Sequence, residues 1–227
     1  MKIFELGEKL LEGVFYTEII RKPSFKYCHS VFKENFYNLI LPTGSLDWES
    51  INQIINDEIR VGRGVSLYIP EGKMDIYIKD LSTHGYIKDL DDLYVFSEIK
   101  EANVLPDFNF VPVTKSNFNN FVEASAYCFP DFPNNTEYCQ FCFDLPDKDQ
   151  DKINYNMLLI EGEQIAAFGS VLVSQELKLA FLHNMGTLPR FRRKGYFVAL
   201  TNYLTKLSAN HGAMIIYANV EDGGTSH

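Results

Sequence analysis

The sequence lacks any apolar run near the roughly 18–20 residues that a membrane-spanning helix needs. Its first residues also lack the apolar stretch and small-residue cleavage site of a signal peptide. Positive charge is scarce, because 21 Lys and Arg residues stand against 30 Asp and Glu residues, for a formal net charge of −9. Nucleic-acid binding needs Lys and Arg to neutralise phosphates. We therefore expect a soluble, cytoplasmic protein with neither a nucleic-acid nor a membrane partner.

Cysteine is scarce as well, with four residues in the chain. Cys139 and Cys142 form a C-x-x-C pair, but no second such pair and no H-x-x-x-H accompanies it. A zinc site needs further ligands at suitable spacing, so we predict no metal. In a cytoplasmic chain we expect these thiols to be reduced.

The sequence does contain enough apolar material for folded cores, since 46% of its residues are hydrophobic and 14% are aromatic. A chain of this length can form one or two domains. Pro106 and the Asn and Asp residues around it break any periodicity between residues 100 and 110. The prediction is an α/β (α+β) chain, with a smaller α/β N-terminal domain at 1–107 and a second domain at 108–227.

Local patterns predict the elements of both domains. In the first, a helix is expected from Ser45, because apolar residues from Trp48 to Ile59 recur near the helical period. Strands are expected there at 38–41, 65–69, 74–78 and 93–99. In the second domain, strands are expected at 110–113, 156–160, 165–173, 177–185 and 213–220. Helices are expected after Ser116 and before His211-Gly212, and 129–152 reads as an irregular stretch.

The most informative segment is Met185-Gly186-Thr187-Leu188-Pro189-Arg190-Phe191-Arg192-Arg193-Lys194-Gly195-Tyr196-Phe197. A strand runs into a proline, a basic loop, a glycine and then a helix. The first amides of a helix have no internal partner, and the helix dipole favours an anion beside them. Three basic residues and a glycine at this point therefore predict a site for a di-anionic group such as a pyrophosphate.

Residues 192–197 resemble the signature of the GNAT acetyltransferase superfamily, which is Gln or Arg, two residues, Gly, one residue, then Gly or Ala. Arg192 and Gly195 match, whereas Phe197 stands where the family has Gly or Ala. The predicted order of elements over roughly 108–220 also agrees with that family. The resemblance implies a GNAT-like mixed central sheet flanked by helices. It further implies an N-acetyltransferase that takes acetyl-coenzyme A and a primary amine on a small molecule or peptide.

The resemblance also implies a cofactor site. Its pyrophosphate would be bound by the signature loop and the backbone amides after it, at Arg192, Arg193, Lys194, Gly195, Tyr196, Phe197 and Val198. The pantetheine arm would pair with the preceding strand at Met185, Gly186 and Thr187. A backbone amide on that strand would polarise the thioester carbonyl. The negative charge of the chain is compatible with a cationic acceptor, although solubility alone also explains it.

His183 is the predicted catalytic base. It shares a strand face with Met185, some family members carry a catalytic histidine at this position, and an ordinary imidazole titrates near neutral pH. A buried, hydrogen-bonded structural histidine is an equal alternative. The other candidates are carboxylates that are expected at the surface and tyrosines that packing explains as well: Glu123, Asp131, Glu137, Tyr138, Tyr196 and Tyr217.

The family's last helix, which carries its usual proton-donating tyrosine, and its closing strands have no counterpart after residue 220. Either the chain is truncated or another chain supplies these elements. The strand at 213–220 would then present an unpaired edge, which predicts a homo-dimer or poor stability.

Two other functions stay open at this stage. The chain could be an acyl-coenzyme A binding or regulatory module without turnover. It could also be another phosphate-binding α/β protein, although G-x-x-x-x-G-K-[ST] and G-x-G-x-x-G are both absent.

Overall fold

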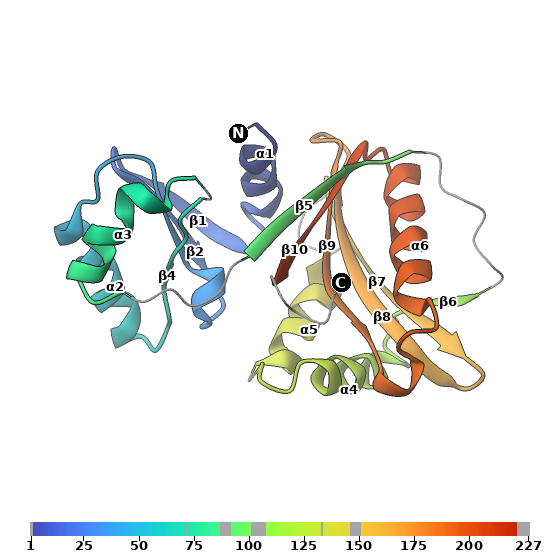
Figure 1. The fold of residues 1–227 in the computed structure, drawn as a ribbon. Helices are drawn as coiled ribbons and strands as arrows, with labels where there is room; N and C mark the ends of the chain where they lie inside the picture. Colours follow the sequence, from blue (N-terminus) through green and yellow to red (C-terminus); the bar gives the residue numbers. More distant parts are fainter. Residues whose placement is uncertain are drawn as a thin grey trace. The chain divides into compact units, whose positions relative to one another are not determined.

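The computed structural model describes residues 2–70, 72–86, 92–100, 108–132, 134–145 and 151–221. The chain forms two compact units, coloured along the sequence in Figure 1. The N-terminal unit comprises residues 11–90. The C-terminal unit comprises residues 91–227 together with residues 1–10, which form most of helix α1 (Lys2–Leu11).

The N-terminal unit contains a four-stranded sheet in the order β1-β2-β3-β4. Its elements are β1 (Tyr16–Arg21), β2 (Phe25–Ser30), the 3₁₀ turn η1 (Asn35–Tyr37), β3 (Leu39–Pro42), α2 (Trp48–Arg60), β4 (Ser66–Leu67) and α3 (Met74–Thr83). Helix α2 begins after Asp47, whose side chain accepts a hydrogen bond from the amide of Ser50. Its buried Ile51 packs on Phe25, Tyr27 and Ile40 of the sheet.

The strand predicted at 74–78 is wrong, because these residues form the first half of α3. Alternation predicts that Ile76 and Ile78 share a buried face, but both are exposed, and the residue between them, Tyr77, is buried. The Tyr77 hydroxyl donates to the carbonyl of Gly44 at 2.9 Å. A pattern of five residues is too short to distinguish the periodicity of a strand from that of a helix. In this helix Tyr77 is the buried residue, and its bond to Gly44 holds it there.

The C-terminal unit is built on a six-stranded sheet in the order β5-β10-β9-β8-β7-β6. Its strands are β5 (Asp92–Glu98), β6 (Asn109–Pro112), β7 (Lys152–Glu161), β8 (Gln164–Ser174), β9 (Leu179–Thr187) and β10 (Ile215–Glu221). Its other elements are α4 (Phe118–Cys128), α5 (Asn135–Asp144), the 3₁₀ turn η3 (Pro189–Phe191) and α6 (Tyr196–Asn210). Neighbouring strands are antiparallel except β9 and β10, which are parallel.

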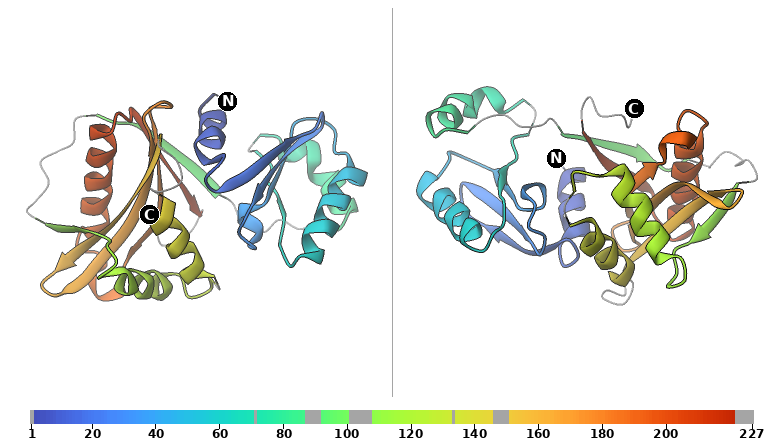
Figure 2. Two further views of the ribbon diagram at one scale, coloured as in Figure 1. Left: turned by 180° about the vertical axis from the view of Figure 1, so that it is seen from behind. Right: turned by 90° about the horizontal axis from the view of Figure 1, so that it is seen from below.

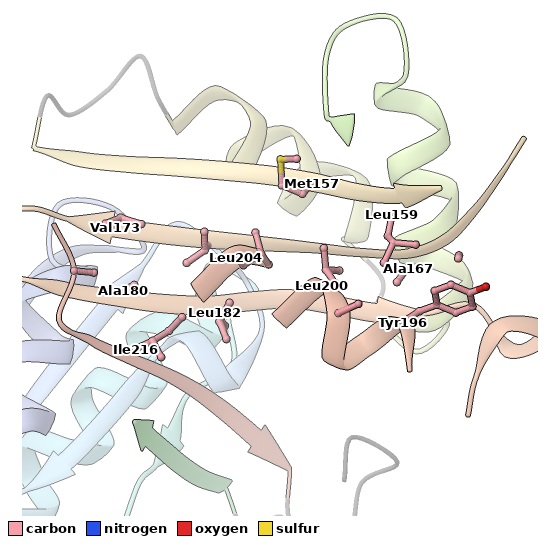
Figure 3. Packing of buried hydrophobic residues seen from close by; sticks show 14 of the residues in the cluster. Met157, Leu159, Ala167, Val173, Ala180, Leu182, Tyr196, Leu200, Leu204 and Ile216 are labelled. Carbon is pink, nitrogen blue, oxygen red and sulfur yellow. The ribbon is translucent and has the colours of Figure 1, made fainter. Parts of the chain in front are cut away.

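Helices cover both faces of this sheet. Helix α6 lies on one face, and α4 and α5 lie on the other, as Figures 1 and 2 show from several sides. On the α6 face, Leu200 and Leu204 are fully buried against strand residues such as Leu159 and Leu182 (Figure 3). On the opposite face, Phe121 of α4 packs against Phe168, and with them lie Ala124, Cys139 and Leu158. The mixed α/β fold that the sequence predicts is confirmed.

The predicted edge at residues 213–220 is wrong. Strand β10 pairs with β9 on one side and with β5 on the other, from Ile215↔Glu98 to Glu221↔Asp92. The strand that covers it lies more than 110 residues earlier in the chain, within the domain predicted at 1–107. The argument for association through this edge therefore fails. The predicted boundary near residue 107 lies outside the described residues, and β5 before it belongs to the second sheet.

Two described helices and two described strands were not predicted from the sequence: α1, α5, β1 and β2. Helix α5 lies in the stretch predicted to be irregular. Among the residues that the structure describes, no helix is long and apolar enough to cross a membrane.

Candidate active site

Strands β9 and β10 part at one end of the sheet. Their parallel pairing runs from Ile215↔Leu179 to Ala218↔Leu182 in the described residues. Beyond Leu182, strand β9 continues to Thr187, while β10 continues beside β5 alone. The pairing of the two strands thus ends after Leu182 and Ala218, in the region where the sequence predicts an opening between them.

A β-bulge marks β9 where the strands part. Phe168 pairs with Gly186 and Ser170 pairs with His183, so two residues of β9, Asn184 and Met185, lie opposite Gly169 alone. Asn184 has a left-handed backbone, with φ of 47°. A Cβ on Gly169 would lie 3.1 Å from Met185 Cγ and about as close to two leucines of α6. The bulge was not predicted from the sequence, and an Asn before a predicted Met-Gly-Thr stretch is its only local signal.

The signature loop connects β9 to α6. After η3, Arg193 and Gly195 both adopt left-handed backbones, with φ of 64° and 83°. The first helical bond runs from the amide of Ala199 to the carbonyl of Gly195, at 2.9 Å. The amides of residues 195–198 therefore have no acceptor within the helix. Amides in this position can donate hydrogen bonds to a bound anion.

The basic residues of the loop do not share one environment. Arg192 Nε donates to the carbonyl oxygen of Thr187 at 3.1 Å, which connects the loop to the end of β9. Lys194 lies over the ring of Phe191, with Nζ 5.6 Å from the ring centroid. Arg193 and Lys194 are exposed beside the helix start, so they are the cations best placed to meet a phosphate.

Residues 119–226 match the model of the acetyltransferase (GNAT) family. This part of the chain belongs to the GNAT family. The sequence has no match among the curated proteins.

Solved structures share the fold of this GNAT domain and of the residues before it. A GCN5-related N-acetyltransferase from Kribbella flavida has a TM-score of 0.67 at 12% identity, over 99% of this chain and 88% of that one. A functionally unknown conserved protein from Staphylococcus epidermidis ATCC 12228 has a TM-score of 0.62 at 10% identity, over 94% and 86%. A GNAT acetyltransferase from Colwellia psychrerythraea has a TM-score of 0.54 at 14% identity, over 88% and 72%. At these identities the likeness shows the fold.

His183 does not have the surroundings expected of a base that solvent can reach. Only 7% of its surface is exposed. Its Nδ1 lies 2.9 Å from the Tyr138 hydroxyl, and its Nε2 lies 2.8 Å from Asn154 Oδ1. Burial lowers the pKa of His183 to about 3. Both ring nitrogens are thus engaged within the GNAT domain, which fits the structural alternative rather than the predicted base.

The network around His183 fixes its tautomer. Asn154 Nδ2 donates to the carbonyl of Cys142 at 2.8 Å, so Asn154 Oδ1 must be the acceptor that faces His183. Nε2 of His183 therefore carries the proton, and Nδ1 accepts from Tyr138. Asn156 and Ser170 extend the network, with Ser170 Oγ donating to Asn156 Oδ1 at 2.6 Å. The five polar side chains are all buried, and together they join α5 to three strands of the sheet.

The buried neutral His183 predicts a loss of stability in acid. In the unfolded chain an ordinary histidine binds its proton below about pH 6.5, whereas folded His183 binds it only near pH 3. The free energy of unfolding should therefore decrease as the pH falls below the unfolded pKa, by roughly 2 kcal/mol at about pH 5. Urea unfolding of wild type and His183→Gln across this range checks it. An equally steep pH dependence in the variant would contradict the assignment.

The remaining candidate residues do not converge on the opening between β9 and β10. Glu123, Asp131 and Glu137 are exposed. Tyr138 is buried in the His183 network, and Tyr196 packs edge-to-face on Phe191. Tyr217 is 2% exposed, and its hydroxyl has no partner in the described part of the chain. Cys139 and Cys142 are both buried on α5, where burial raises the pKa of each thiol.

Proposed function

We propose that this GNAT domain transfers an acetyl group from acetyl-coenzyme A to a primary amine on a small molecule or peptide. The observation that carries the proposal is the combination of three features at one place: the parting of β9 and β10, the bulge at Asn184, and the helix start at Gly195. In this proposal the parting of the strands is the slot that takes an extended arm, the bulge re-aims backbone groups, and the helix start offers amides to phosphate.

The residues present fit the coenzyme. Among the described residues, and apart from the chain neighbours of Gly195, no atom lies within 4 Å of the position that a Cβ would take there, so a phosphate can approach the backbone. The loop from Arg192 to Gly195 is exposed. The hydroxyl of Thr187, at the end of β9, is buried without a hydrogen-bond partner among the described residues, and a ligand in the slot could supply one. The proposed contacts are those of Met185, Gly186 and Thr187 with pantetheine, and of residues 193–198 with pyrophosphate.

When bound, the coenzyme supplies a thioester whose carbonyl carbon forms a bond to the amine nitrogen as the bond to sulfur breaks. The chain's part is to hold and polarise that carbonyl with backbone amides at the β9 bulge, where they are fixed before the reaction. The helix start and the charges of Arg193 and Lys194 hold the phosphates. In this proposal His183 would neither take the proton from the amine nor give one to the sulfur, because both of its ring nitrogens are engaged inside the protein.

A second candidate is an acyl-coenzyme A binding module without turnover, and the burial of His183 favours it. Both candidates bind the coenzyme, but only the first consumes it.

Titration calorimetry with acetyl-coenzyme A, and with ATP as the control, tests the shared part of the two candidates. We expect micromolar binding of acetyl-coenzyme A and none of ATP, because ATP lacks the arm that enters the slot. Binding of ATP alone would instead favour a nucleotide site. Release of free thiol in the presence of a panel of amines then separates the candidates: acetylation of any amine supports transfer, and binding without release supports the module.

A further inference from the structure

Four side chains around the β9 bulge form a closed ring of hydrogen bonds. Ser125 comes from α4, Asn135 and Cys139 come from α5, and Asn184 is the bulge residue itself. The links, in order around the ring, are Cys139 Sγ to Asn135 Oδ1 at 3.3 Å, Asn135 Nδ2 to Ser125 Oγ at 3.1 Å, Ser125 Oγ to Asn184 Oδ1 at 2.9 Å, and Asn184 Nδ2 to Cys139 Sγ at 3.8 Å.

Every member of the ring donates once and accepts once. The thiol donates to the Asn135 carbonyl oxygen, the Asn135 amide donates to the Ser125 hydroxyl, and the hydroxyl donates to Asn184. The Asn184 amide closes the ring with a weak bond to the sulfur. Bonds that run in one direction around a ring polarise one another, and in a buried place each is stronger than in water. Ser125 and Cys139 are both fully buried, and Asn135 is 5% exposed.

The ring holds a backbone conformation that is unfavourable by itself. Asparagine adopts a left-handed backbone more readily than most residues, but within a strand this conformation persists only where its surroundings fix it. At Asn184 the surroundings that fix it are the side chains of α4 and α5. The residues directly before Cys139 and Asn184 are joined as well, because Tyr138 of α5 forms a hydrogen bond with His183 of β9. Successive residues of α5 thus hold successive residues of β9.

We propose that Ser125, Asn135 and Cys139 are positioning residues that act through Asn184. By fixing the bulge they fix the direction of the backbone amides that face the thioester carbonyl. The inference rests on the proposed function, since it assigns a purpose to the bulge in that reaction. It also gives a role to the C-x-x-C cysteine Cys139 that involves neither a metal nor a disulfide.

The matched variants are Cys139→Ser and Cys139→Ala. Serine keeps one donor and one acceptor at this position, whereas alanine opens the ring. We expect Cys139→Ser to retain kcat within about threefold and Cys139→Ala to lose roughly 10- to 100-fold, because small misplacements of reacting groups have effects of this size. KM and Kd for acetyl-coenzyme A should change little in both variants, because the helix start that holds the phosphates is intact.

Asn184→Gly separates positioning from stability. Glycine adopts a positive φ without strain but cannot join the ring. We expect this variant to unfold close to the wild-type temperature and yet to lose as much kcat as Cys139→Ala. A wild-type kcat in Asn184→Gly would overturn the inference, because the bulge would then support the reaction without the ring of hydrogen bonds.

A measurement that needs no turnover uses acetyl-coenzyme A labelled with ¹³C at the thioester carbonyl. Infrared difference spectra should show the carbonyl band shifted on binding to wild type and to Cys139→Ser, with a smaller shift in Cys139→Ala. Equal shifts in both Cys139 variants, with binding intact, would overturn the inference alone. A wild-type protein that does not bind acetyl-coenzyme A would overturn the proposed function and this inference with it.

Discussion

Gly195→Glu is expected to abolish binding of acetyl-coenzyme A, with a loss of affinity of at least about 100-fold, or roughly 2.7 kcal/mol. Gly195 has a φ of 83°, which a residue with a side chain rarely adopts, so the substitution strains the loop at the helix start. The new side chain would occupy the open space beside the first amides of α6. Its carboxylate would also compete with phosphate for those amides and for the charges of Arg193 and Lys194.

Gly62→Glu is the matched control. Gly62 lies after α2 in the N-terminal unit and has a φ of 75°. Its Cβ position is open as well, since no atom of the described chain other than its own neighbours lies within 4 Å. The same substitution there imposes the same kind of backbone strain and adds the same charge. Calorimetric titration of both variants separates the two effects: the control should bind like wild type. Comparable affinity in Gly195→Glu would remove this loop from the cofactor site.

The signature loop is the part of the site that the sequence predicts best, and the reason is that its geometry is local. A strand, a proline, basic residues and a glycine lie within a dozen positions, and α6 follows with a helical apolar pattern. Gly195 is at the helix start, as expected, because only a left-handed residue connects this loop to the helix without strain. No contact from a distant part of the chain is needed to fix this arrangement.

His183 shows the limit of a prediction that is made from the sequence of a single strand. The sequence places it in the correct strand, but the ring is covered by Tyr138 of α5 and bonded to Asn154 of β7. Helix α5 was itself not predicted, because the Pro- and Asn-rich stretch that contains it has a weak helical pattern. Whether a histidine in a strand is a base or a core residue depends on what covers that face, and here a non-local helix decides it.

The ring at Asn184 and the covered edge of β10 could not be predicted for the same reason. The ring joins residues that are up to 59 positions apart, and β5 pairs with a strand more than 110 residues later. In each case the local sequence is ordinary: an asparagine within a strand, and a short apolar strand before a polar stretch. Only the topology brings the partners together, because long-range pairing leaves no periodic signal in either segment.

Gly186→Ala should destabilise the protein by roughly 3 kcal/mol, because β9 has no room for a methyl group at this position. A Cβ on Gly186 would lie 2.5 Å from Phe168 Cζ and 3.0 Å from Cys128 Sγ. Phe168 is fully buried and packs edge-to-face on Phe121 and Phe129, so its ring cannot move aside without disturbing the core under α4. Either the strand or the ring must shift, and the unfolding free energy measured in urea should decrease accordingly.

Gly169→Ala is the milder comparison, since its Cβ would meet Met185 Cγ and two leucine methyl groups at 3.1–3.3 Å, which is less close than the contact at Gly186. Phe168→Leu removes the ring atoms that Gly186→Ala would strike. This substitution alone should cost about 1 kcal/mol or more through lost packing. The two changes together should cost at least about 1 kcal/mol less than the sum of their separate effects, because the leucine vacates the space that the methyl group needs. Strict additivity in this double-mutant cycle would show that the contact between Gly186 and the Phe168 ring does not limit the packing of β9.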